Sequence, residues 1–156
     1  MQNRDVWRVR TFHVAQSTAM SCITACVCMA RRRRGEAVDD AQILTEWGSI
    51  GPFALRLHAR DLRVPQYPDA VDPDARSSRE LLAGTLALGY WVIVTIVPLP
   101  HPGRPHAIVL IGVTEEDAYI YLDPAGAAVD QPLAFMEDDF VRQWTGEMVV
   151  VEGPAG

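Results

Sequence analysis

Two apolar runs in the second half of the chain are its clearest structural signal. Residues 90–97 (YWVIVTIV) form an unbroken run rich in β-branched side chains, and residues 106–113 (HAIVLIGV) form another. Short apolar runs without polar alternation are typical of buried strands. A polar turn at residues 115–117 follows, so residues 118–122 are predicted to return as the antiparallel partner of the second strand. The second half therefore predicts an antiparallel sheet.

Helical spacing marks the first half of the chain. Cys22, Cys26 and Met29 recur at i, i+4 and i+7, so they share one face of a helix predicted over residues 21–33. Ser21 is expected to cap this helix through its hydroxyl group. Gly35 follows the predicted end, where glycine is a common helix-terminating residue.

Weaker signals predict the remaining elements. Residues 77–80 read as a capping box that opens a helix extending to Leu88 and closed by Gly89. Other helices are predicted at residues 40–47, 52–62 and 136–144, and short strands at residues 6–14, 64–67 and 147–152. Together these elements predict one α+β domain over residues 1–156, in which a helical half packs on an antiparallel sheet half.

Composition narrows the class of protein. The 156 residues suffice for one core, and a hydrophobic content of 49% argues against disorder. The net charge of −6 does not favour nucleic acid or an anionic membrane as a partner. No apolar run is long enough to span a bilayer and no secretory leader is present, so we expect a cytoplasmic protein, with secretion as an effector by a non-classical route left open. The sequence carries no signal for the oligomeric state.

An arginine run and a cysteine cluster each have a structural interpretation. Arg31–Arg34 would complement the dipole at the end of the first helix, and the alternative is a patch for an acidic peptide or nucleic acid. The three cysteines lie within seven residues, which cannot build a disulfide framework. There is no second cluster for zinc, no phosphate-binding loop and no acidic metal motif, so no cofactor or metal is predicted.

Cys22 is placed where a thiolate is favoured. It falls in the first turn of its predicted helix, where unpaired N–H groups and the helix dipole stabilise negative charge. A nucleophilic thiolate needs a histidine to take its proton, and that histidine needs a group that fixes its tautomer. If Cys22 is a nucleophile, such a histidine and such a tautomer-fixing group are therefore expected elsewhere in the sequence.

His106 and Asp123 meet this need. His106 begins the second apolar run, and Asp123 follows the return strand. In an antiparallel hairpin the start of the first strand lies beside the end of the second, so the two side chains are predicted neighbours. On its own, Asp123 would be read as a turn residue before Pro124, and His101 is a rival histidine in the preceding loop. His13 is interpreted as a half-exposed strand residue without a catalytic role.

The order Gln16, Cys22, His106, Asp123 resembles that of papain-like cysteine peptidases. It is most similar to the peptidase domains that remove double-glycine leaders from bacteriocin precursors, which carry the pattern read here as Gln16, Cys22, Ala25, Cys26 and Met29, then His106 to Gly112, then Asp123-Pro124. The resemblance covers residues 9–126 and implies a papain-like fold, an active site in the cleft between the two halves, and a peptide or protein substrate.

The resemblance also implies roles beyond the three reacting residues. The Gln16 side-chain amide and the Cys22 backbone N–H would form an oxyanion hole. The family usually has glycine directly after the nucleophile, whereas this chain has Ile23, whose β-branched side chain is expected to crowd the oxyanion region. Alternatives to peptide hydrolysis are deamidation or acyl transfer by the same thioester chemistry, and a silent domain that binds a peptide.

Overall fold

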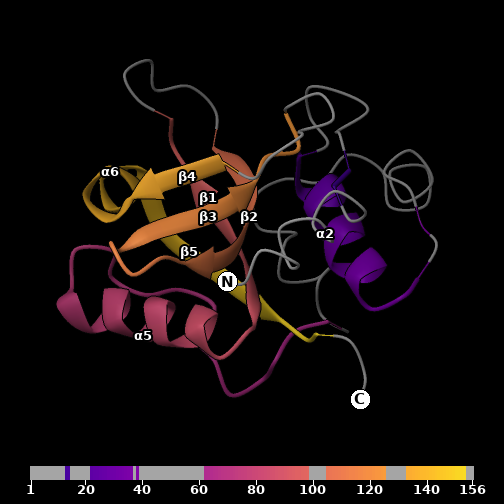
Figure 1. Cartoon of the computed structure of the whole chain (residues 1–156), viewed down its shortest axis with the longest axis horizontal. Coiled ribbons are helices and arrows are strands. Elements are labelled where there is room, and N and C mark those ends of the chain that lie inside the picture. The colour runs from indigo at the N-terminus through magenta and orange to yellow at the C-terminus, as the bar shows by residue number, and fades with distance from the viewer. Residues whose placement is uncertain are drawn as a thin grey trace.

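The computed structural model describes residues 13–14, 22–36, 38, 62–98, 105–125 and 133–153. Its helices are α2 (Cys22–Arg33), α5 (Arg76–Ala87) and α6 (Glu137–Gln143). Its strands are β1 (Trp91–Ile96), β2 (His106–Val113), β3 (Ala118–Leu122), β4 (Leu133–Met136) and β5 (Trp144–Val151). The strands form one antiparallel sheet in the order β4-β3-β2-β1-β5 (Figure 1). The predicted α+β class is confirmed.

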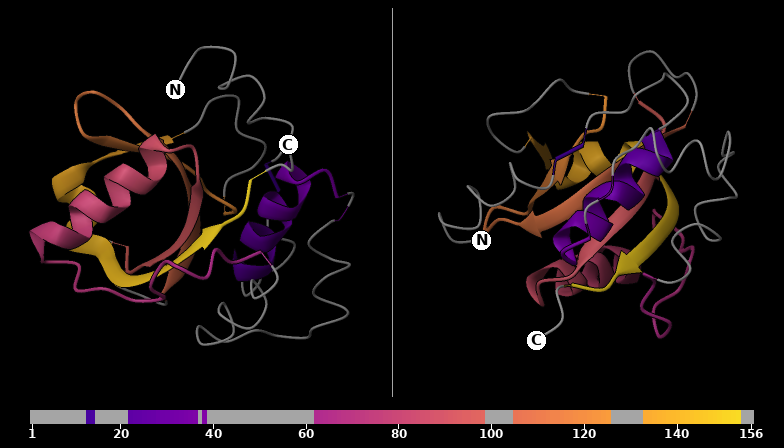
Figure 2. Two further views of the ribbon diagram at one scale, coloured as in Figure 1. Left: turned by 90° about the horizontal axis from the view of Figure 1, so that it is seen from below. Right: turned by 90° about the vertical axis from the view of Figure 1, so that its right-hand side faces the viewer.

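The sheet is covered on both faces, which explains why its central strands are apolar throughout. Alternate residues of β1, β2 and β5 point to opposite faces. One face packs against α2, and the other packs against α5 and α6 (Figure 2). For example, Val109 lies in the cluster that contains α2 residues, while its neighbour Leu110 lies in the cluster that contains Leu82 of α5 and Phe140 of α6. Every residue of β1 is therefore buried.

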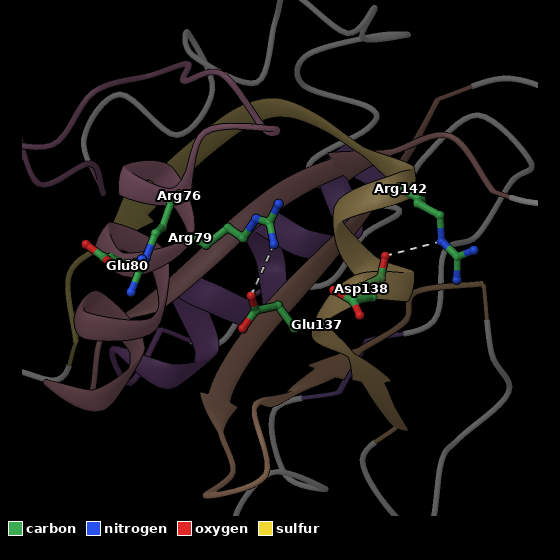
Figure 3. A network of polar contacts seen from close by, with 6 residues as sticks. All are labelled: Arg76, Arg79, Glu80, Glu137, Asp138 and Arg142. Atoms are coloured by element: carbon green, nitrogen blue, oxygen red, sulfur yellow. Dashed lines mark hydrogen bonds and ion pairs between the residues drawn. The ribbon is translucent and has the colours of Figure 1, made fainter.

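Polar contacts hold α5 and α6 together on the face away from α2. Arg79 of α5 forms an ion pair with Glu137 at the start of α6, with 3.6 Å between Nη1 and Oε1 (Figure 3). Within α6, the Arg142 Nε–H donates to the Asp138 carbonyl oxygen at 3.3 Å. These contacts lie on the opposite side of the sheet from α2 and Cys22.

The strongest sequence patterns are confirmed. The predicted strands at residues 106–113 and 118–122 coincide with β2 and β3, and the run at residues 90–97 contains β1. The helix predicted at residues 21–33 is α2, but its burial is wider than the one face expected, because all residues from Ile23 to Ala30 are buried. The residues on both sides of α2 therefore belong to the core.

Several weaker predictions are wrong. The capping box at residues 77–80 does not open α5, which begins at Arg76 after Ala75 and has no side-chain cap. Glu80 instead pairs with Arg76, one helical turn away. Residues 64–67 do not form a strand, and the chain on either side of them pairs with β5 through isolated bridges at Arg63 and Ala70.

Other predictions fall short at their ends or lie outside the description. The helix predicted at residues 136–144 is shorter, because Met136 ends the unpredicted β4 and Trp144 begins β5. The predicted helix at residues 40–47 lies outside the described residues, as do residues 52–61 of the next one and residues 6–12 of the first strand. His13 and Val14 are described and are not in a strand. Within the described part of the chain, no helix is long and apolar enough to cross a membrane.

Candidate active site

Cys22 is the first residue of α2 and is half-buried. The first backbone N–H groups of a helix have no partner within the helix, and they favour negative charge nearby. Here the backbone N–H groups of Ile23 and of Ala107, in β2, point at the Cys22 sulfur. The sulfur thus sits where α2 meets the sheet, with donors from both elements directed at it.

His106, at the start of β2, is held between Cys22 and Asp123. Its Nε2 lies 2.7 Å from Oδ1 of Asp123, which directly follows β3. Since a carboxylate only accepts hydrogen bonds, Nε2 carries the proton in this contact. The other ring nitrogen, Nδ1, is then left for the hydrogen bond that joins His106 to the Cys22 thiol. In the neutral ring this tautomer gives Nδ1 a free lone pair, which can take the thiol proton.

The three side chains stabilise one another's charges. Burial raises the pKa of the Cys22 thiol, but the hydrogen bond and charge of His106, with the two backbone N–H groups, lower it below its usual value. Burial lowers the pKa of His106, but the hydrogen bonds and charges of Asp123 and Cys22 raise it to about 9. These opposite shifts favour a thiolate paired with an imidazolium.

Asp123 is itself fixed by two further contacts. The Ala125 backbone N–H donates to Oδ1 of Asp123 at 2.8 Å. Burial raises the pKa of the Asp123 carboxyl, but the hydrogen bonds from His106 and Ala125, with the charges of His106 and His13, lower it below its usual range. His13 Nε2 lies 2.9 Å from the Asp123 backbone oxygen. Asp123 therefore stays ionised beside His106.

The structure brings together three of the four predicted site residues, namely Cys22, His106 and Asp123. Gln16, the predicted oxyanion residue, and the rival His101 lie outside the described residues. His13 is the neighbour that sequence reasoning missed. Its contact with Asp123 spans 110 residues, and no spacing pattern in the sequence signals it.

Ile23, the departure from the family pattern, has its side chain in the core. It is 7% exposed and belongs to the hydrophobic cluster formed by α2 and the sheet. Its backbone N–H still points at the Cys22 sulfur. The side chain thus contributes to packing, while the backbone supplies a polar contact that any residue except proline could supply at this position.

The arginine run at the end of α2 is largely engaged within the molecule. Arg31 pairs with Glu36 at 3.3 Å, and the Arg32 Nε–H donates to the Val38 carbonyl oxygen at 2.7 Å. The Arg33 guanidinium lies 4.4 Å from the centroid of the Trp91 ring and donates to Gly89. Burial lowers the pKa of Arg33 to about 10. These contacts support the structural interpretation for three of the four arginines.

The cysteines and acids do not form a metal centre in the part of the chain that the structure describes. No group of three or more His, Cys, Asp or Glu side chains there could hold a metal ion. Cys26 and Cys28 are buried cysteines of α2.

The fold is that of papain-like peptidase domains of the double-glycine type. It resembles a double-glycine motif protease from an AMS/PCAT transporter, solved in complex with its leader peptide, with a TM-score of 0.58 and 16% identity over 91% of this chain and 90% of that one. It also resembles the peptidase domain of Streptococcus ComA, a bi-functional ABC transporter of a quorum-sensing pathway, with a TM-score of 0.64 and 17% identity over 91% and 97% of the two chains.

A third solved structure, of a C39-like peptidase candidate from Bacillus anthracis, matches with a TM-score of 0.65 and 16% identity over 94% of this chain and 97% of that one. No protein-family model and no curated protein sequence matches the chain. The likeness in three dimensions confirms the predicted resemblance at the level of the fold.

Proposed function

We propose that this protein is a cysteine peptidase in which Cys22 is the nucleophile, His106 the proton carrier and Asp123 the residue that orients His106. The observation that carries the proposal is the hydrogen-bonded series from Cys22 through His106 to Asp123, with 2.7 Å between the histidine and the carboxylate. The resemblance to double-glycine peptidase domains supports a peptide substrate.

In the first half of the reaction, the Cys22 thiolate attacks the carbonyl carbon of the scissile peptide bond. The carbonyl oxygen gains negative charge and is stabilised by the Cys22 backbone N–H and, as the family resemblance implies, by the Gln16 amide. The His106 imidazolium donates its Nδ1 proton to the leaving amine as the C–N bond breaks. A thioester between Cys22 and the acyl part of the substrate remains.

In the second half, the neutral His106 takes a proton from a water molecule, which attacks the thioester carbonyl. Collapse of the tetrahedral intermediate breaks the C–S bond and releases the carboxylic acid. The thiolate and the imidazolium are thereby restored. Throughout, Asp123 holds the Nε2 proton of His106, so the ring presents Nδ1 to the sulfur in both halves.

We infer that the substrate is a peptide cleaved after small residues, such as a double-glycine leader. The test is to incubate the protein with synthetic precursors that carry Gly-Gly before the cut, and with matched peptides in which larger residues replace both glycines. Cleavage of the first set alone, read by mass spectrometry, is the expected result. Equal cleavage of both sets would contradict the small-residue preference.

The mechanism is tested with Cys22→Ala and His106→Ala, which are both expected to abolish turnover. His101→Ala is the matched control, because the sequence marks His101 as the rival histidine, and it should retain the wild-type rate. Turnover by Cys22→Ala would overturn the mechanism. A deamidated glutamine in a peptide with an intact backbone would show that the thioester forms from a side-chain amide. A crosslinked amine would show that the acyl group of the thioester is passed to an amine instead of water.

A further inference from the structure

The contact between His13 and Asp123 joins the two parts of the chain that carry the site. His13 Nε2 lies 2.9 Å from the Asp123 carbonyl oxygen, and a carbonyl oxygen only accepts hydrogen bonds. His13 therefore donates through Nε2 in either of its charge states. The donor lies nine residues before Cys22, whereas the acceptor belongs to the residue that bonds His106.

Both ends of this hydrogen bond are anchored in the same core. Val14, next to His13, is 7% exposed, and Leu122, next to Asp123, is 1% exposed. Both side chains belong to the cluster that α2 forms with the sheet. Because their neighbours are packed, neither the imidazole nor the carbonyl group can move far without disturbing the core.

Asp123 has need of such a contact because the sheet does not hold it. The last pair of the ladder between β2 and β3 is Val109 with Leu122, so the Asp123 backbone lies beyond the strand. Its side chain is held by Ala125 and His106, and its carbonyl group by His13. A carboxylate at the end of a strand is oriented only as well as the peptide unit that carries it.

We propose that His13 is a positioning residue, which holds the Asp123 carbonyl group and thereby keeps the Asp123 carboxylate in line with His106. This role deepens the proposed peptidase function and rests on it. His13 does not touch the reacting sulfur in this scheme; it acts through Asp123.

The charged and titratable groups around Asp123 agree with this role. They are His106, His13 and, on the adjoining strand, Tyr121, whose pKa is raised by burial and by the Asp123 charge. Cys22 faces His106 from α2. If Asp123 is displaced, His106 loses part of its support as an imidazolium, and Cys22 in turn loses part of its support as a thiolate.

The test compares three variants of His13 that differ in reach and in donor capacity. His13→Gln keeps an N–H donor at a reach similar to that of Nε2, His13→Asn keeps the donor on a shorter side chain, and His13→Phe keeps the ring shape without a donor. The first readout is the pH dependence of Cys22 alkylation by iodoacetamide, which requires no substrate. The second is kcat and KM, with the pH profile of kcat/KM, for the synthetic Gly-Gly precursor.

We expect His13→Phe and His13→Asn to raise the alkylation midpoint by about one pH unit, which corresponds to a tenfold loss of thiolate support. The alkaline limb of kcat/KM should move to lower pH, and kcat should fall about tenfold with KM unchanged, which is less than the ~10²–10⁴ of general acid–base catalysis. In His13→Gln, the alkylation midpoint and the alkaline limb of kcat/KM should both lie at their wild-type pH values.

The proposal would be overturned if His13→Asn had the alkylation midpoint and the alkaline limb of kcat/KM of the wild type. It would also be overturned if these two quantities were the same in His13→Gln and His13→Asn. This pair decides the matter even if His13→Phe fails to fold. The alkylation readout separates the two proposals: a wild-type protein that cleaves no precursor would count against the peptidase function alone, whereas unchanged alkylation midpoints in His13→Asn would count against the positioning role alone.

Discussion

At the scale of single residues, the site depends on one proton shared between Cys22 and His106. Its hydrogen bonds hold the thiol pKa below its usual value and the imidazole pKa at about 9. Between these two values the thiolate and the imidazolium exist together. The better the surrounding hydrogen bonds and charges stabilise the thiolate and the imidazolium, the wider this pH interval is.

We therefore expect a bell-shaped pH profile for kcat/KM. Activity should rise with pH as Cys22 loses its proton, and fall again near pH 9 as His106 loses the proton that the leaving amine requires. The measurement is initial rate against pH with the Gly-Gly precursor. An alkaline limb near the usual histidine pKa of about 6.5 would show that Asp123 and Cys22 do not support the imidazolium.

Asp123→Asn should narrow this profile. The amide keeps the size of the side chain but removes the charge that helps to raise the pKa of His106, so the alkaline limb should move to lower pH. We expect kcat to fall by about tenfold or more, because the ring loses its fixed tautomer. Asp74→Asn, at an exposed position away from the site, is the control and should leave the limb in place. Identical limbs in Asp123→Asn and wild type would contradict the orienting role.

At the scale of elements, the start of α5 shows how a helix can form without the expected cap. Ala75 occupies the N-cap position with φ −75° and ψ 133°, and no side chain accepts from the first turn. Tertiary packing compensates, because Leu82 and Leu86 are buried against the sheet. Most helical stability in proteins comes from such packing.

Ala75→Asp should accordingly stabilise the protein. The backbone already has the conformation that a capping residue adopts, so a carboxylate there can accept from N–H groups of the first turn and should add ~0.5–2 kcal/mol. Urea unfolding at neutral pH is the measurement. Ala75→Val, which cannot cap, is the control, and equal unfolding midpoints for the two variants would contradict the prediction.

At the scale of the whole molecule, the segment from Arg63 to Val71 is fastened along the outer edge of β5. The Val71 N–H donates to the Gly146 carbonyl oxygen at 2.9 Å, and isolated bridges join Arg63 to Val151 and Ala70 to Glu147. Gly146 has φ +91°, and a Cβ atom there would collide with the Val71 backbone oxygen. The close approach of these two backbone segments thus depends on glycine, which has no side chain, at position 146.

Gly146→Ala should destabilise the protein by at least ~1–3 kcal/mol, because both the backbone angle and the collision oppose it. Gly84→Ala is a control of opposite sign. Gly84 lies within α5, where a Cβ would meet nothing within 4 Å, and alanine is favoured over glycine in a helix by ~1 kcal/mol. Urea unfolding of both variants tests this pair, and a stabilised Gly146→Ala would refute the argument.

Local patterns in the sequence were sufficient where a structural relation is itself local. The pairing of His106 with Asp123 follows from one hairpin, whose strands are marked by apolar runs and whose turn is marked by polar residues. The helix α2 follows in the same way from the helical spacing of Cys22, Cys26 and Met29. The exposed edge strand β4 had no such mark, since it is short and three of its four residues are exposed.

The sequence by itself therefore determined the apolar strands, the helix that carries Cys22 and the neighbouring His106 and Asp123, because each is encoded by residues close together along the chain. Only the tertiary structure decided that Cys22 meets His106, that the Ile23 side chain belongs to the core, and that His13 holds Asp123. Those contacts arise from packing α2 and the segment before it onto the sheet. Such packing is set by the fit of many buried side chains at once, and no short stretch of sequence records it.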